Sequence, residues 1–230
     1  MARFLLILFL FAPVKLQAGK HLFLLIQKEE TFQADANLWA TFFQNNCGNI
    51  QVTRPHEYST IEVVSIFNDY RVRLASKDTL IIVVSAHTVR YGNCTLLQYP
   101  GGSDIFDVVV FKNTYETFLE ELSRKGVRVL LIVNSCEPFT VITPTLTFKI
   151  RGLTIVYSDE DYSIFNENSG SLLAILIYQH RFLNMKTCIE WVNERFLDKS
   201  IYYGVDKTLN TPISDNYPQK TTIYGPDYTF

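Results

Sequence analysis

The stretch TLIIVVSAH, residues 79–87, decides the fold class of this chain. Its first seven residues form an apolar, largely β-branched run that ends in a serine. A continuous run of this kind is typical of a central parallel strand that is covered on both faces. A second run, VRVLLIV at residues 127–133, leads directly into Asn134, Ser135 and Cys136. Together the two runs predict the centre of a parallel sheet.

The segments around these runs alternate between strand-like and helix-like patterns. Further strands are expected at residues 21–26, 50–53, 95–98, 105–111 and 153–157, and helices at 34–44, 60–70, 115–125, 169–181 and 185–196. This alternation predicts an α/β fold, a mostly parallel sheet with helices on both faces. Because no repeat or low-complexity linker interrupts the pattern, one domain is expected over residues 19–200, followed by an irregular tail over 201–230.

The N-terminus has the pattern of a signal peptide. Arg3 precedes the apolar run at residues 4–12, Pro13 ends that run, and Ala18 supplies a small residue for cleavage. A bilayer span needs roughly 20 apolar residues, more than this run provides. We therefore expect a signal peptide over residues 1–18 and entry into the endoplasmic reticulum. An uncleaved anchor or a buried first strand is the alternative.

Composition bounds the class of protein. The 230 residues are 47% hydrophobic and 14% aromatic, which favours one sizeable core over disorder. The net charge is -2 and the Lys and Arg residues are scattered, so the sequence does not indicate a nucleic-acid-binding surface. Since the four cysteines lack C-x-x-C spacing and no phosphate loop or metal cluster is visible, we expect no metal and no cofactor. Asn93 begins an N-glycosylation sequon, Asn-Cys-Thr.

A histidine and a cysteine follow the two buried runs. His87 comes two residues after Ser85, and Cys136 lies 49 positions further along the chain. If the strands are parallel neighbours, both residues leave the sheet at its carboxyl edge, where α/β sheets carry their functional groups. A cysteine nucleophile with its histidine about 50 residues upstream is the caspase arrangement.

Cysteine chemistry requires such a pair. The thiolate is the attacking species, and a nearby imidazole can take the thiol proton and later protonate the leaving amine. Backbone N–H groups at the strand ends can hold the oxyanion. The structural alternative is that Cys136 is a small core residue and His87 a surface or capping residue.

Around these residues the sequence resembles the legumain and GPI transamidase family of cysteine peptidases. The stretch at 79–87 resembles the family's strand that ends in T-G-H-G. The stretch VLLIVNSCE, at 129–137, resembles its second strand, where an apolar run is followed by Asp, any residue, Cys and then Glu or Gln. The resemblance implies a single caspase-like domain in which His87 is the general base and Cys136 the nucleophile.

Fainter likenesses extend the expected site. Residues 31–37 resemble the start of the family's first helix, which implies a role for Asn37, and residues 153–163 resemble a segment beside its substrate pocket. A solvated turn is the alternative for the acidic residues 158–161. The residues expected to border the substrate or the oxyanion are Thr88, Glu137, Ser158, Asp159 and Asn37.

Departures from the family pattern bear on the reaction. Asn134 stands where the family has Asp, and Gln33 and Ala34 replace a basic pair that binds asparagine in legumain-like enzymes. The resemblance therefore favours the catalytic subunit of a lumenal GPI-anchor transamidase, which removes a C-terminal signal and attaches a GPI lipid. Its expected partners are other subunits of a membrane-bound complex, substrate proteins and the GPI lipid. The alternatives are a legumain-type asparaginyl endopeptidase and a non-catalytic scaffold.

Overall fold

The computed structural model describes ten segments of the chain. They are residues 18–28, 30–57, 59–91, 94–101, 104–106, 108–135, 150–158, 165–166, 170–196 and 221–230. The predicted signal peptide, apart from Ala18, and residues 201–220 of the predicted tail lie outside them.

A six-stranded sheet forms the centre of the molecule, in the order β11-β8-β7-β3-β1-β2. All neighbouring strands in it pair in parallel except β11, which is antiparallel to β8 at one edge. The strands are β1 (Lys20–Ile26), β2 (Gln51–Thr53), β3 (Thr79–Ser85), β7 (Arg128–Asn134), β8 (Leu153–Ser158) and β11 (Thr221–Tyr224).

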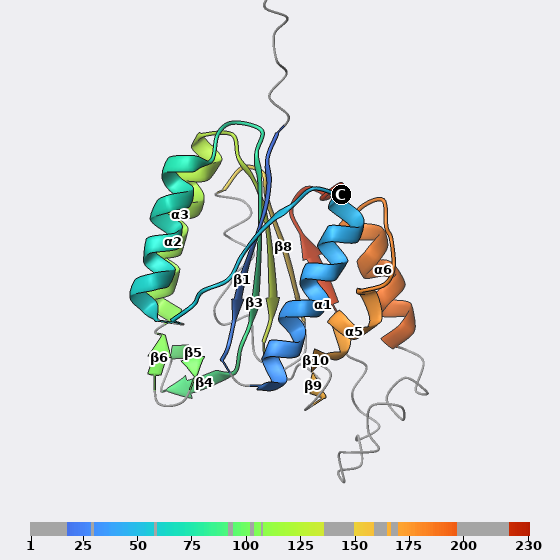
Figure 1. Ribbon diagram of the computed structural model, residues 1–230, viewed down its shortest axis with the longest axis horizontal. Coiled ribbons are helices and arrows are strands. Elements are labelled where there is room, and N and C mark those ends of the chain that lie inside the picture. The colour runs from blue at the N-terminus through green and yellow to red at the C-terminus, as the bar shows by residue number, and fades with distance from the viewer. Residues whose placement is uncertain are drawn as a thin grey trace, which may run out of the picture.

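Helices cover both faces of this sheet (Figure 1). On one face lie α2 (Thr60–Arg73) and α3 (Val108–Arg124), and on the other lie α1 (Glu30–Cys47), α5 (Leu172–Ile177) and α6 (Met185–Phe196). Along β3, Leu80 and Ile82 join one apolar cluster while Ile81 joins the other. Since β3 is buried on both faces, its run carries no polar alternation. The predicted α/β fold is confirmed.

Two small antiparallel sheets lie at the carboxyl edge of the main sheet (Figure 1). One contains β4 (Thr88–Tyr91), β5 (Cys94–Gly101) and β6 (Asp104–Phe106), and the other contains β9 (Phe165–Asn166) and β10 (Gly170–Ser171). Both therefore border the edge where the sequence places the candidate catalytic residues.

Two predicted elements differ from the structure. The strand expected at 105–111 is wrong from Val108 onward, because Val108 begins α3. Phe118 and Leu119, further along α3, are completely buried against the sheet, and such packing outweighs the weak strand preference of a valine run. The helix expected at 169–181 is shorter, since Ser171 ends β10 and caps α5 through its side chain.

The irregular tail predicted for 201–230 is wrong for residues 221–230. This segment contains β11, which pairs with β8, and the buried Tyr228. The ring of Phe230 lies 5.4 Å from that of Phe42 in α1, edge to face. The end of the chain is thus part of the core. Among the helices described, none has the length and apolar character needed to cross a membrane.

Candidate active site

The ends of β3 and β7 define the candidate site. The two strands are parallel neighbours, and their register pairs Ser85 with Asn134. His87 lies two residues beyond Ser85, and Cys136 lies two residues beyond Asn134. The register therefore brings the two stretches of chain that carry the expected dyad to one edge. Cys136 itself lies outside the described residues, which end here at Ser135, so the dyad stays a prediction.

The backbone at His87 is held by the residue that follows β1. The His87 N–H donates to the side-chain oxygen of Gln27 at 2.7 Å, and the Gln27 N–H donates to the Ser85 carbonyl at 2.8 Å. Gln27 is completely buried. His87 as a residue is exposed, and its ring meets the buried ring of Phe32 edge to face at 4.7 Å. The site thus combines a fixed backbone with a residue at the surface.

Asp35, in the second turn of α1, is completely buried beneath this edge. Its Oδ2 accepts hydrogen bonds from Ser85 Oγ at 2.6 Å and from Asn134 Nδ2 at 2.9 Å. Its Oδ1 accepts from the backbone N–H of Ser171 at 2.6 Å and from that residue's hydroxyl at 2.7 Å. One side chain therefore joins the ends of β3 and β7 to the start of α5.

Burial is the main influence on the charge of Asp35. Loss of solvent raises the pKa of its carboxyl, and the hydrogen bonds from Ser85, Ser171 and Asn134 act in the opposite direction. No lysine or arginine of the described segments forms an ion pair with Asp35. Within the described segments, hydrogen-bond donors and not a counter-charge therefore offset part of the cost of burying the carboxylate.

The same contact explains a departure from the family pattern. The resemblance leads one to expect an acid at position 134, but an aspartate there would set a second carboxylate against Asp35. Asn134 offers an N–H₂ donor at that point and so complements the buried acid. The asparagine therefore fits the network that surrounds it.

Gly170 allows β10 to approach Asp35. A Cβ atom at this position would lie 2.8 Å from Asp35 Oδ1 and 3.0 Å from Leu38 Cδ1. The backbone there has a φ of +89°, a conformation that L side chains rarely adopt. Both features require glycine beside the buried carboxylate.

Asn37, the other candidate on α1, lies on the exposed side of the helix. Its Oδ1 accepts from Arg54 Nη1 at 3.2 Å, and Arg54 Nη2 donates to the Ala36 carbonyl, also at 3.2 Å. Arg54 follows the edge strand β2. The structure thus brings Asp35, and not Asn37, to the ends of β3 and β7.

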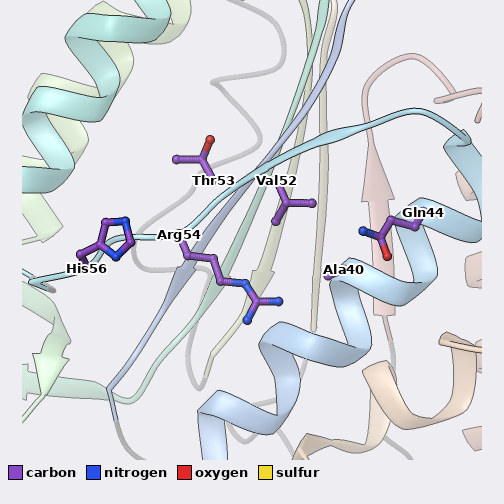
Figure 2. A pocket seen from close by; sticks show the side chains of 6 residues that line it. All are labelled: Ala40, Gln44, Val52, Thr53, Arg54 and His56. Atoms are coloured by element: carbon purple, nitrogen blue, oxygen red, sulfur yellow. The ribbon is translucent and has the colours of Figure 1, made fainter.

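A shallow hollow lies next to Asn37. Figure 2 shows it between α1 and the carboxyl end of β2, with the Arg54 side chain reaching toward the helix. It is lined by Ala40, Gln44, Val52, Thr53, Arg54 and His56. This hollow belongs to the edge of the sheet rather than to its centre, where the dyad is expected.

The remaining candidates divide between strand ends and segments that are not described. Thr88 begins β4 directly after His87 and pairs with Leu97 in β5. Ser158 ends β8, the neighbour of β7, and pairs with Thr221 in β11. The predictions for Glu137, Asp159 and Asn93 lie outside the described residues.

Sequence reasoning missed Gln27, Asp35 and Ser171. For Asp35 a signal exists, because it falls within the apolar stripe of α1 between Phe32 and Trp39, both of which are buried. An acid at such a position must find buried partners. Gln27 and Ser171 carry no comparable signal, since their contacts depend on how distant segments meet.

Comparison with known proteins identifies structures with a similar fold. No protein-family model and no curated protein sequence matches this chain. Among solved structures, protein GSU0716 from Geobacter sulfurreducens is similar, with a TM-score of 0.56 and 12% sequence identity. The match covers 91% of this chain and 94% of the GSU0716 chain. The Drosophila initiator caspase Dronc is similar with a TM-score of 0.55 and 10% identity, covering 90% and 79% respectively. The chain therefore has a caspase-like α/β fold.

Proposed function

We propose that this chain is a cysteine-dependent acyl-transfer enzyme in which His87 and Cys136 form the catalytic dyad. The pairing of Ser85 with Asn134 carries the proposal, because each candidate follows its paired residue by two positions. The caspase-like fold supports it, since the dyad is expected at the carboxyl edge of the sheet.

The chemistry proceeds in two steps. His87 takes the proton of Cys136, and the thiolate attacks the substrate's carbonyl carbon to form a tetrahedral oxyanion. The C–N bond then breaks, His87 returns its proton to the leaving amine, and an acyl thioester remains on Cys136. In the second step an acceptor nucleophile attacks the thioester and releases the thiol.

Fixed strand ends make this reaction feasible. The dyad must meet at close to hydrogen-bonding distance, and small displacements are costly in rate. Gln27 ties the backbone of His87 to β1, and Asp35 ties the end of β3 to the end of β7. Through these contacts Gln27 and Asp35 act as positioning residues.

For the acceptor we propose the ethanolamine amine of a GPI lipid, which makes the reaction a transamidation. The resemblance of residues 79–87 and 129–137 to the legumain and GPI transamidase family supports this choice, as does the expected signal peptide. Gln33 and Ala34, which replace the family's basic pair, disfavour an asparagine-specific hydrolase. The chain would then act within the lumen of the endoplasmic reticulum, with membrane-bound partner subunits.

Complementation in cells depleted of their own transamidase catalytic subunit tests the proposal. The wild-type chain, Cys136→Ala and His87→Ala are compared at equal expression for surface display of a GPI-anchored reporter. Cys188→Ala serves as a control, because Cys188 is completely buried in α6. Rescue by the wild type and the control alone supports the proposal. Rescue by all four proteins would show that the chain is a scaffold.

A peptide assay separates transfer from hydrolysis. Purified chain is incubated with a peptide that carries a small residue at the scissile bond, with and without hydroxylamine as a small nucleophilic acceptor. Transfer predicts a hydroxamate product that depends on Cys136, whereas cleavage of asparaginyl peptides at equal rates with and without the acceptor would favour the endopeptidase.

A further inference from the structure

A second feature lies at the opposite, amino end of the sheet, where β1 begins. The backbone nitrogen of Gly19 donates to Asp78 Oδ1 at 2.7 Å, and the Gly19 carbonyl accepts from the Thr79 N–H at 2.9 Å. Gly19 is thus held from both sides by the residues that open β3. The preceding residue, Ala18, is exposed.

Asp78 is fixed in place by its own loop. Its Oδ2 accepts from the Ala75 N–H at 2.8 Å, and its backbone carbonyl accepts from the Arg128 N–H at 2.9 Å. Within the described segments no lysine or arginine forms an ion pair with Asp78. The half-buried carboxylate of Asp78 therefore accepts from the nitrogen of Gly19 and has no lysine or arginine of the described segments as an ion-pair partner.

Position 19 also favours glycine, because little space is left for a side chain. A Cβ atom there would lie 2.8 Å from His21 Nε2 and 3.3 Å from Asp78 Oδ1. His21 is 8% exposed and cannot move easily out of the way. The chain thus changes from an exposed small residue to a glycine with fixed contacts at the end of the expected signal peptide.

We propose that the Ala18–Gly19 bond is a processing site, and that the amino group freed at Gly19 forms an ion pair with Asp78. A signal-peptidase-type protease adds water across this bond, leaving a carboxylate on Ala18 and an ammonium on Gly19. The existing N–H···O contact then becomes a charge-assisted hydrogen bond, which is roughly twice as strong as a neutral one. Removal of the leader would in this way fasten β1 to the start of β3, independently of the dyad.

The test begins with the full chain expressed with its leader in cells of a secretory host. Mass spectrometry of the purified protein gives its N-terminus, which we expect to be Gly19. The α-amine is then labelled with an amine-selective reagent, and the N-terminal peptide is quantified. In wild type this labelling should be several-fold slower than in Asp78→Asn. Asp227→Asn is the matched control, since Asp227 is exposed and likewise accepts a backbone N–H, that of Lys186 at 3.0 Å, in another part of the chain.

If Asp78→Asn does not fold, the pH dependence of labelling in the wild-type protein tests the ion pair without a variant. The pH of half-maximal labelling should lie above the range of about 7.7–8.0 that is typical of an unpaired α-amino group. Of the described residues, the other titratable or charged groups at this point are His21, Asp69 and Arg73; burial lowers the pKa of His21, and the last two pair with each other. An N-terminus other than Gly19, or labelling that is as fast in wild type as in Asp78→Asn, would overturn the proposal. So would a half-maximal pH within the ordinary range.

Discussion

Exchanging the two polar partners beneath the candidate site tests whether they act as a unit. Asp35 and Asn134 share one hydrogen bond of 2.9 Å, with the acid on α1 and the amide on β7. We consider Asp35→Asn, Asn134→Asp and the double variant that carries both changes. In the double variant the amide on the helix donates to an acid on the strand, so that the donor and the acceptor exchange places.

The single changes should each destabilise the fold. In Asn134→Asp, two carboxylates would face each other at the 2.9 Å now spanned by the hydrogen bond. Their repulsion amounts to about 6 kcal/mol at an effective dielectric constant of about 20. One of them would therefore take up a proton, which limits the loss at neutral pH to at most about 4 kcal/mol. In Asp35→Asn, an amide N–H₂ would face a donor, which costs about 1–3 kcal/mol.

The double variant should recover most of this loss. The oxygen of the new amide on α1 would still accept from Ser171, and its N–H₂ group would donate to the new carboxylate on β7. Ser85 could also donate to that relocated carboxylate. We expect a free energy of unfolding within about 1 kcal/mol of wild type, compared with a loss of up to about 7 kcal/mol if the single effects added.

Urea unfolding monitored by tryptophan fluorescence provides the assay. Trp39 is buried in α1, one turn after Asp35, and therefore reports on this region. The reasoning is refuted if the double variant is as unstable as the sum of the two single variants, or if Asn134→Asp alone leaves stability unchanged.

Three further predictions concern single residues. Gly170→Ala should lower the free energy of unfolding by about 1–3 kcal/mol, since the site has a φ of +89° and no room for a Cβ atom; an unchanged urea midpoint would contradict this. Burial raises the pKa of the Asp35 carboxyl above the ordinary value of 3.8. The contribution of this carboxyl to the free energy of unfolding is therefore complete below pH 3.8 and is lost as the pH rises through the raised pKa. The stability gap between wild type and Asp35→Asn should therefore narrow with rising pH in a series of urea titrations, and a gap that widens would be inconsistent with it. Burial also raises the pKa of the Cys47 and Cys188 thiols, so alkylation followed by peptide mass spectrometry should find both protected until the chain unfolds. Rapid labelling of either thiol in the folded protein would show that the core is more open than described.

Elements with a single dominant pattern could be predicted from the sequence. The bounds of β3 and α6 agree with those expected, because one is a continuous apolar run and the other an amphipathic repeat. The sequence pattern does not reveal the edge strand β11, since its residues are mostly only partly buried and its neighbours are rich in turn-forming residues. Its place depends on pairing with β8, which is distant in the sequence.

The site could be predicted only in its outline. Two buried strands that lead into His87 and Cys136 point to the carboxyl edge, and the register of β3 and β7 agrees with that expectation. The hydrogen bonds beneath the site could not be foreseen from the sequence. They join Asp35 to Ser85, Asn134 and Ser171, which lie 50, 99 and 136 positions away from it along the chain. Contacts of this kind follow from the assembled fold and leave little trace in local sequence.

The reactivity of Cys136 as a function of pH tests the central claim most directly. Alkylation of this thiol is followed by peptide mass spectrometry and compared between wild type and His87→Ala. The control is His180→Ala, because His180 is an exposed histidine outside the site. A dyad predicts rapid labelling of the wild type and the control well below about pH 8.5, the ordinary pKa of a cysteine, and a shift of the profile toward that value in His87→Ala. Identical profiles for all three proteins would contradict the account and leave Cys136 an ordinary thiol.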